Sequence, residues 1–164
     1  MPKKIQKDIQ IHEITFSDSE QLIGQMRSHN IPIKVGRYKT YIFPDSMEER
    51  NTNGVLRLSR SDTRVKDFGF GELGNSIYAL LREGVIVSAC VSARENNECA
   101  ESWVFTSPEN RRKGFAQKVV LAWAKEKIGS GIIPFYSHED DNIPSMELAN
   151  KLGLIPVFEE ISIF

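Results

Sequence analysis

The pattern of apolar and polar residues is weaker in the first half of the chain than in the second. Apolar and polar positions alternate from Ile9 to Phe16, which predicts a half-buried strand. Ser17 and Glu20 have the spacing of a capping box, so we expect a helix to follow them. The apolar face of this helix would be formed by Leu22, Ile23 and Met26.

A second strand is predicted over residues 39–43, with Pro44 stopping it. From Asp45 to Phe68 the composition shifts to charged residues, Asn and Gly. A short apolar patch at Val55 and Leu56 interrupts this polar stretch. We therefore expect a loop here, with room for one short element.

Three β-rich runs follow, over residues 76–81, 85–93 and 100–106. The first two flank Arg82-Glu83-Gly84, where the glycine is available for the positive φ of a tight hairpin. A polar turn over residues 94–97 leads to the third run. Three sequential antiparallel strands are the simplest arrangement of these runs.

Beyond residue 106 the apolar spacing becomes helical. Ala116, Val119, Val120 and Trp123 would place one apolar stripe against the sheet. Gly129-Ser130-Gly131 stops this helix, and residues 132–137 then read as a buried strand.

The last part of the chain predicts a helix followed by a strand. Asn142 is a favourable N-cap for a helix that runs to Leu152, with Pro144 tolerated in its first turn. Gly153 ends this helix, and residues 157–163 form the final strand. We found no internal repeat and no linker, so one domain over residues 1–164 is expected.

Composition excludes several classes of function. Lys and Arg number 21 against 22 Asp and Glu, a net charge of −1, which argues against a nucleic-acid partner. Two cysteines, Cys90 and Cys99, are too few for a disulfide framework or a zinc cluster, and buried free thiols are expected. Apolar runs long enough to span a membrane are missing, so we expect a cytoplasmic protein that does not enter a membrane.

The most informative stretch joins the strand at residues 100–106 to the following helix. It carries the cations Arg111, Arg112 and Lys113 at the start of the predicted helix. The positive end of the helix dipole lies there and favours acidic side chains instead. An anion bound there would explain the three cations, because the amides of the first helical turn point outward and Gly114 permits a close backbone approach. The expected ligand is a phosphate or pyrophosphate.

Two motifs identify the family that this stretch resembles. The phosphate-loop pattern of nucleotide triphosphatases and the dinucleotide-binding fingerprint are both absent. Arg111, Gly114 and Ala116 instead match Arg/Gln-x-x-Gly-x-Gly/Ala, the pyrophosphate loop of the GNAT superfamily of acyl-CoA N-acyltransferases. Residues 136–154 resemble the closing strand, Asn-containing turn and helix of the same superfamily.

The resemblance covers residues 76–164, which would form the acetyl-CoA-binding core, whereas residues 1–75 would form a variable portion on the acceptor side. It implies an α/β (α+β) fold in which helices flank both faces of a mixed, mostly antiparallel sheet. It further implies an N-acetyltransferase that passes an acetyl group directly from acetyl-CoA to an amine, without a metal. Acetyl-CoA and an amine-bearing acceptor would be its partners, and homodimer formation is left open.

The same resemblance assigns the cofactor site residue by residue. The strand backbone at Val104, Phe105 and Thr106 would bind the pantetheine arm. The pyrophosphate would lie on the amides of Arg112, Lys113, Gly114, Phe115 and Ala116, near the side chains of Arg111, Arg112 and Lys113. Asn142 and Ser145 would contact the cofactor arm.

Glu101 is the candidate general base, since it lies on the strand that leads to the loop and a carboxylate suits this role. An ion pair with a neighbouring cation is its alternative role. Many members place a tyrosine where this chain has Ala149, so Tyr136, Ser145 or solvent would return the proton to the leaving thiolate. Simple packing is the alternative role of Tyr136.

Three further expectations remain. His138, beside Glu139 and Asp140, is expected in a solvated loop rather than in a metal site. Arginines within residues 30–75 would shape the acceptor pocket and favour an acidic acceptor; the polar candidates there are Arg37, Tyr38, Arg57, Arg60 and Arg64. A non-catalytic CoA-binding module, or a transferase for a longer acyl-CoA, is the alternative function.

Overall fold

The computed structural model describes residues 16–44, 47, 51–68 and 76–164. Close packing divides the chain into two units, one of residues 1–36 with Ile161–Phe164 and one of Arg37–Glu160. The strand expected at Ile9–Phe16 lies outside the described residues except for Phe16, which belongs to a helix.

The first unit contains α1 (Phe16–Ser28), the helix predicted after the first strand. The helix begins one residue before Ser17, so this serine lies inside the first turn rather than ahead of it. Of the expected apolar face, Ile23 is buried, whereas Leu22 is exposed. Lys34 and Phe164 exchange two backbone hydrogen bonds of 3.0 and 2.9 Å, as a closely spaced antiparallel pair does.

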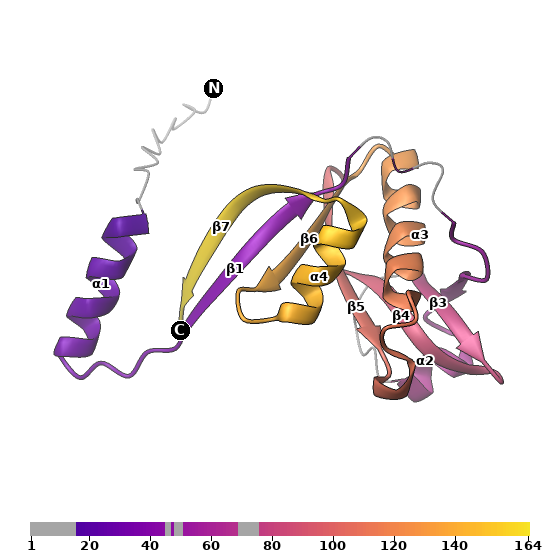
Figure 1. Ribbon diagram of the computed structural model, residues 1–164, viewed down its shortest axis with the longest axis horizontal. Helices are drawn as coiled ribbons and strands as arrows, with labels where there is room; N and C mark the ends of the chain where they lie inside the picture. Colours follow the sequence, from indigo (N-terminus) through magenta and orange to yellow (C-terminus); the bar gives the residue numbers. More distant parts are fainter. Residues whose placement is uncertain (1–15, 45–46, 48–50, 69–75) are drawn as a thin grey trace, which may run out of the picture. The chain divides into compact units, whose positions relative to one another are not determined.

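Seven strands form one sheet in the order β2-β3-β4-β5-β6-β1-β7 (Figure 1). Their bounds are β1 Val35–Ile42, β2 Leu56–Ser59, β3 Ser76–Arg82, β4 Val85–Glu95, β5 Cys99–Thr106, β6 Ile133–Glu139 and β7 Ile155–Ile163. The β5–β6 pair is parallel, whereas β2–β3, β3–β4, β4–β5 and β1–β6 are antiparallel. The predicted mixed, mostly antiparallel sheet is confirmed.

Helices cover both faces of this sheet within Arg37–Glu160. On one face α3 (Phe115–Gly129) and α4 (Ile143–Leu152) bury an apolar cluster around Trp123, whose indole N–H donates to the Ser92 hydroxyl at 2.9 Å. On the other face α2 (Thr63–Phe68) contributes Val65 to a cluster with Ile77 and Val91. The expected flanking of both faces is therefore confirmed.

Residues 45–68 hold more structure than the sequence pattern predicted. Both β2 and α2 form within a stretch expected to carry at most one short element. Strand β2 gains its backbone bonds from pairing with β3, and only Leu58 of its four residues is buried. Helix α2 is assisted by Asp62, whose carboxylate accepts from the amide of Arg64 at 3.0 Å and from its side chain. Strand pairing and helix capping of this kind do not depend on the spacing of apolar residues, so apolar periodicity did not predict β2 and α2.

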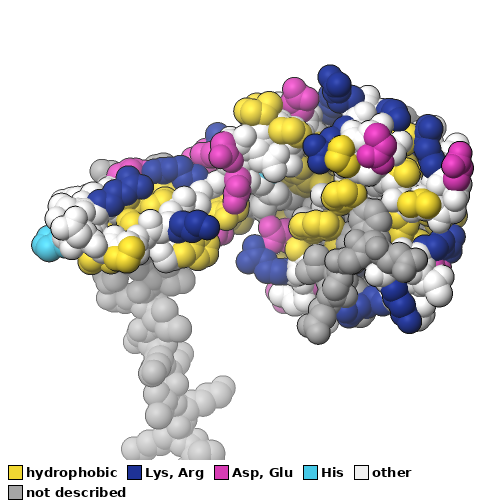
Figure 2. Space-filling view, turned by 90° about the horizontal axis from the view of Figure 1, so that it is seen from below, with side chains coloured by type: hydrophobic (Ala, Val, Ile, Leu, Met, Phe, Trp, Pro, Cys, Tyr) yellow, Lys and Arg dark blue, Asp and Glu magenta, His cyan; other side chains and the backbone are white. Residues whose placement is uncertain are grey.

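No helix in the described ranges combines the length and apolar character that a membrane span requires. Figure 2 shows acidic and basic side chains interspersed over the visible face rather than segregated by sign.

The β3–β4 hairpin turns on Glu83 and Gly84, which have φ values of 50° and 80°. Positive φ at both central residues defines the type I′ turn that matches the twist of paired strands. We expect Gly84→Ala to lower the free energy of unfolding by about 1–2 kcal/mol, because a Cβ is disfavoured in this conformation.

Gly129→Ala is the matched control for Gly84→Ala, since Gly129 ends α3 without a positive φ. Outside its chain neighbours and the backbone of its own helix, no described atom lies within 4 Å of an ideal Cβ at Gly129. Urea denaturation of the two variants should show a loss for the first and no loss for the second. Equal midpoints would contradict the conformational argument.

Candidate active site

The parallel strands β5 and β6 separate part-way along their length. Their pairing runs from Cys99↔Ile133 to Ser102↔Tyr136. Beyond this point β5 stays paired with β4 as far as Thr106, while β6 stays paired with β1 as far as Glu139. The two strands therefore open into a V, which Figure 1 shows between β5 and β6. Val104, Phe105 and Thr106 lie on the arm formed by β5.

Each arm of the V leads into a helix. β5 continues through the 3-10 turn Pro108–Asn110 to α3, and β6 continues through a short turn to α4. In open sheets of this kind, ligands bind in the crevice beyond the carboxyl ends of the strands. The sequence thus places two helix N-termini beside the same opening.

The N-terminus of α3 lacks a capping side chain. Its N-cap is Gly114 at φ 77°, and its first turn, which the structure describes in full, contains no acid. Arg112 also has a positive φ, 60°, so the loop turns sharply just before the helix. Apart from Gly114 itself and its two chain neighbours, no described atom lies within 4 Å of an ideal Cβ at this position. The space beside Gly114 is therefore open, and an anion at this helix N-terminus would gain from both the first-turn amides and the dipole.

The cations of this loop already hold parts of its backbone. The Arg111 guanidinium donates to the carbonyl of Thr106 at 3.2 Å, which ties the loop to the end of β5. The Lys113 ammonium donates to the carbonyl of Glu109 at 2.8 Å and to Oδ1 of Asn110 at 3.2 Å. Arg82, at the end of β3, lies 5.2 Å from the ring centre of Phe115 and adds a further cation beside the helix start.

The second predicted cofactor segment begins α4 as expected. Asn142 is the N-cap, and its Oδ1 accepts from the amide of Ser145 at 3.2 Å. The Tyr136 hydroxyl donates to the carbonyl of Ser145 at 3.3 Å, and its side chain is 2% exposed. Burial raises the pKa of Tyr136 to about 12. This phenol therefore stays protonated at neutral pH and packs beneath the first turn of α4.

Glu101 lies at the apex of the V, in register with Phe135. One of its oxygens, Oε2, accepts from Nε of Arg94 at 2.6 Å and from a second guanidinium nitrogen at 2.5 Å. The Glu101 side chain is 19% exposed, whereas that of Arg94 is 79% exposed. The structure thus contains the ion pair considered as the alternative role, and Oε1 of Glu101 remains outside the two contacts with Arg94.

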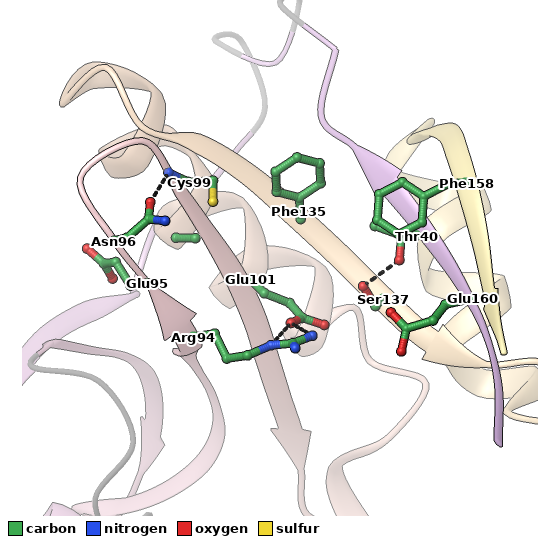
Figure 3. A pocket seen from close by; sticks show the side chains of 11 residues that line it. Thr40, Arg94, Glu95, Asn96, Cys99, Glu101, Phe135, Ser137, Phe158 and Glu160 are labelled. Carbon is green, nitrogen blue, oxygen red and sulfur yellow. Dashed lines mark hydrogen bonds and ion pairs between the residues drawn. The ribbon is translucent and has the colours of Figure 1, made fainter. Parts of the chain in front are cut away.

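Glu101 also lines a pocket of about 390 Å³ (Figure 3). Tyr136 belongs to the core beneath α3 and α4, so Phe135 and Ser137, its neighbours on β6, face the other side of the sheet. The pocket lies on that other side. It is lined by Thr40, Arg94, Glu95, Asn96, Cys99, Ala100, Glu101, Phe135, Ser137, Phe158 and Glu160.

The arginines expected to shape the acceptor pocket do not line the pocket at Glu101. Among the described residues of 30–75, Thr40 alone lines the pocket. Arg57 lies 2.9 Å from Glu126 and Arg64 lies 2.6 Å from Asp62, so local carboxylates engage both. The lining residues that sequence reasoning missed come from β4, β5, β6 and β7 and from Asn96 in the β4–β5 turn, and no local motif marks them.

Two further expectations have mixed outcomes. Cys90 is buried, and burial raises the pKa of its thiol, but Cys99 is half-buried and lines the pocket.

The solvated loop expected for His138 is wrong, because His138 lies on β6 and is 5% exposed. Its Nδ1 lies 2.8 Å from the carbonyl of Glu139, so Nδ1 carries the proton, and Nε2 lies 3.2 Å from the Tyr41 hydroxyl. Within the described ranges, no three His, Cys, Asp or Glu side chains gather as a metal site would require.

Comparison with known protein families shows which family the chain belongs to. The family model described as GNAT acetyltransferase matches residues 63–159, more than half of the chain. The chain belongs to the GNAT acetyltransferase family. Its matched part contains the V, the loop at Arg111–Gly114 and both helices that follow the two arms. No curated protein matches the chain significantly.

Solved structures show the same GNAT fold at low sequence identity. A GNAT-family protein from Novosphingobium aromaticivorans superposes with a TM-score of 0.68 at 18% identity, over 79% of this chain and 64% of that one. An acetyltransferase from Colwellia psychrerythraea has a TM-score of 0.60 at 13% identity, over 80% and 56%. An N-acetyltransferase-like protein from Streptococcus suis has a TM-score of 0.57 at 14% identity, over 91% and 68%. The chain spans less than two thirds of the first two relatives.

Proposed function

We propose that this GNAT-family chain is an acetyl-CoA-dependent N-acetyltransferase that transfers the acetyl group directly to an amine. The observation that supports it most strongly is the uncapped N-terminus of α3 at the open end of the V. A polyphosphate ligand matches the amides, the dipole and the cations Arg111, Arg112 and Lys113 gathered there.

The proposed cofactor path follows the V from its open end to its apex. The pyrophosphate lies on the amides of Arg112, Lys113, Gly114, Phe115 and Ala116. The pantetheine arm pairs with the backbone of Val104, Phe105 and Thr106, on the edge of β5 that no longer pairs with β6. Asn142 and Ser145 border the other arm. The thioester then reaches the apex, close to Glu101.

The proposed reaction moves one acyl group and two protons. The amine nitrogen attacks the thioester carbonyl carbon, the carbon–sulfur bond breaks, and the CoA thiolate leaves. Glu101 accepts the proton that the amine loses, through Oε1, which lies outside the contacts with Arg94. Tyr136 is the proposed donor to the thiolate, and its hydroxyl would turn from the Ser145 carbonyl to the sulfur to serve.

A non-catalytic CoA-binding module is favoured by one specific observation. Ala149 is buried in the core beneath α3, so no phenol stands at the place where many members carry one. Such a module would bind acetyl-CoA and release no CoA when amines are added.

Calorimetry and a CoA-release assay test the proposal on the intact chain. We expect saturable acetyl-CoA binding with a dissociation constant in the micromolar range, that is, about −8 kcal/mol. CoA release should increase on adding primary amines, and the acetylated amine should appear in equal amount. Binding without acetylated product would favour the module, and no binding at all would contradict both. Propionyl-CoA and succinyl-CoA in the same assay would reveal a preference for a longer acyl group.

A further inference from the structure

Two phenylalanine side chains line the pocket at Glu101. Phe135 comes from β6 and Phe158 from β7, and β1 lies between these two strands. Phe158 is 52% exposed and Phe135 is half-buried, so both rings have surface that a ligand can cover. In Figure 3 the two rings lie toward one end of the pocket, and the ion pair of Glu101 with Arg94 lies toward the other.

The two faces of β6 differ in burial. Tyr136 lies in the core beneath α3 and α4, and Pro134 and His138, which share its face by alternation, are also buried. Phe135 and Ser137 alternate with them on the pocket face and are only half-buried. An apolar group that covers the ring of Phe135 therefore removes apolar surface from water, which favours binding.

The floor of the pocket near the two rings is polar in composition but already satisfied. Thr40 on β1 lies opposite Ser137 on β6, and their hydroxyls bond each other at 2.9 Å. Because each hydroxyl has a partner, an apolar group placed over them leaves neither unpaired. Both side chains are also much smaller than a phenylalanine, so they leave room for a flat group beside the rings.

The candidate base lies within reach of this aromatic surface. Glu101 and Phe135 are in register on the neighbouring strands β5 and β6, on the same face of the sheet. Neighbouring strands lie about 5 Å apart, so an amine at Glu101 and a ring beside Phe135 can belong to one molecule with a linker of two or three carbons.

We infer that the preferred acceptor is an arylalkylamine, that is, a primary amine joined to an aromatic ring by two or three carbons. The inference rests on the proposed acetyl transfer and adds the class of acceptor. The reacting amine lies at Glu101, and the aromatic ring lies over Thr40 and Ser137, in contact with Phe135 and Phe158. Aromatic rings in contact attract each other beyond the gain from buried area, so a saturated ring of the same size binds less well.

Three primary amines test the inference: 2-phenylethylamine, 2-cyclohexylethylamine and n-butylamine. We expect kcat/KM for phenylethylamine to exceed that for cyclohexylethylamine about fivefold, and butylamine, which has no ring, to be the slowest. Phe158→Leu should reduce the fivefold ratio to about twofold, because leucine keeps the apolar surface but removes one of the two aromatic rings.

Phe164→Leu is the matched control, because Phe164 is an exposed phenylalanine that does not line the pocket. It should preserve the fivefold ratio. Equal rates for phenylethylamine and cyclohexylethylamine, a faster reaction with butylamine, or equal effects of the two substitutions would overturn the inference while leaving acetyl transfer intact.

Calorimetric titration with 2-phenylethylamine in the presence of CoA distinguishes failure of the acceptor class from failure of acetyl transfer. Binding that is weakened two- to threefold by Phe158→Leu and unchanged by Phe164→Leu supports the ligand class even if none of the three amines is acetylated, a result that would overturn the transfer alone. Phenylethylamine binding that neither substitution changes, or no binding, would overturn the acceptor class.

Discussion

Gly114→Glu should raise the dissociation constant of acetyl-CoA by at least about 100-fold. The glutamate side chain would enter the open space beside Gly114, at the N-cap of α3, and bring a negative charge to the place proposed for the pyrophosphate. Two like charges about 4 Å apart near a protein surface repel by about 4 kcal/mol, which exceeds the loss needed for this change. Isothermal titration calorimetry with acetyl-CoA and with CoA measures it.

Two controls separate charge at the site from damage to the helix. Gly129→Glu makes the same change at the other end of α3, where no anion site is proposed, and should leave the affinity unchanged. Gly114→Ala adds neither charge nor reach and should weaken binding only through its unfavourable φ of 77°. An acid at a helix N-terminus also stabilises the helix, so Gly114→Glu should remain folded by circular dichroism. Unchanged affinity in folded Gly114→Glu would contradict the assigned pyrophosphate site.

Local signals explain why the second half of the fold was predictable. The β3–β4 turn needs positive φ at residues 83 and 84, Asn142 caps α4, and Gly153 ends α4 in the left-handed region. Each of these features depends on a few neighbouring residues, so it can be recognised in the sequence without knowledge of the fold.

The order of strands was not predictable in the same way. β1 lies between β6 and β7, so residues 35–42 pair with a strand about a hundred residues away. Its register places Thr40 opposite Ser137 and Lys39 opposite His138. No turn chemistry or periodicity encodes such a pairing. His138 was misjudged for this reason, because its acidic neighbours suggested a solvated loop while β1 covers it with Tyr41.

The loop of the candidate site was predictable from the sequence, whereas its pocket was not. The loop at Arg111–Gly114 is contiguous, and both its position before α3 and the conformation of Gly114 agree with the sequence pattern. The pocket is assembled from separate strands, and Phe158 and Glu160 become its lining only through the position of β7. Arg57 and Arg64 were expected to shape the acceptor pocket, and the structure pairs them with Glu126 and Asp62, which the sequence analysis did not predict.

The ion pair between Glu101 and Arg94 separates two explanations for any effect of changing Glu101. A pair whose arginine side chain is 79% exposed contributes little to stability, because water and salt screen it. Loss of the pair should therefore leave the thermal midpoint almost unchanged. A large loss of rate in a Glu101 variant would then have to come from chemistry rather than from unfolding.

Glu101→Gln should lower kcat/KM for acetyl transfer by about 10²–10⁴-fold while leaving the dissociation constant of acetyl-CoA unchanged. An alkylamine with a pKa of about 10.4 must lose a proton before attack, at a cost of about 4.6 kcal/mol at pH 7. Glutamine is close to isosteric and can still meet Arg94, but it accepts no proton. The deficit should shrink as pH approaches the pKa of the amine, because more acceptor is then already neutral. Initial rates of CoA release between pH 6.5 and 9.5 measure this dependence.

Glu98→Gln is the matched control, since Glu98 lies in the β4–β5 turn, where its backbone amide donates to Asn96 and its carbonyl accepts from the amide of Ile133. It should retain the rate and the pH profile of the unsubstituted chain. Arg94→Gln should keep transfer active, because it leaves the carboxylate in place and frees both oxygens for the amine. Equal losses in Arg94→Gln and Glu101→Gln, with parallel pH profiles, would assign Glu101 to the ion pair alone and leave deprotonation of the amine to solvent.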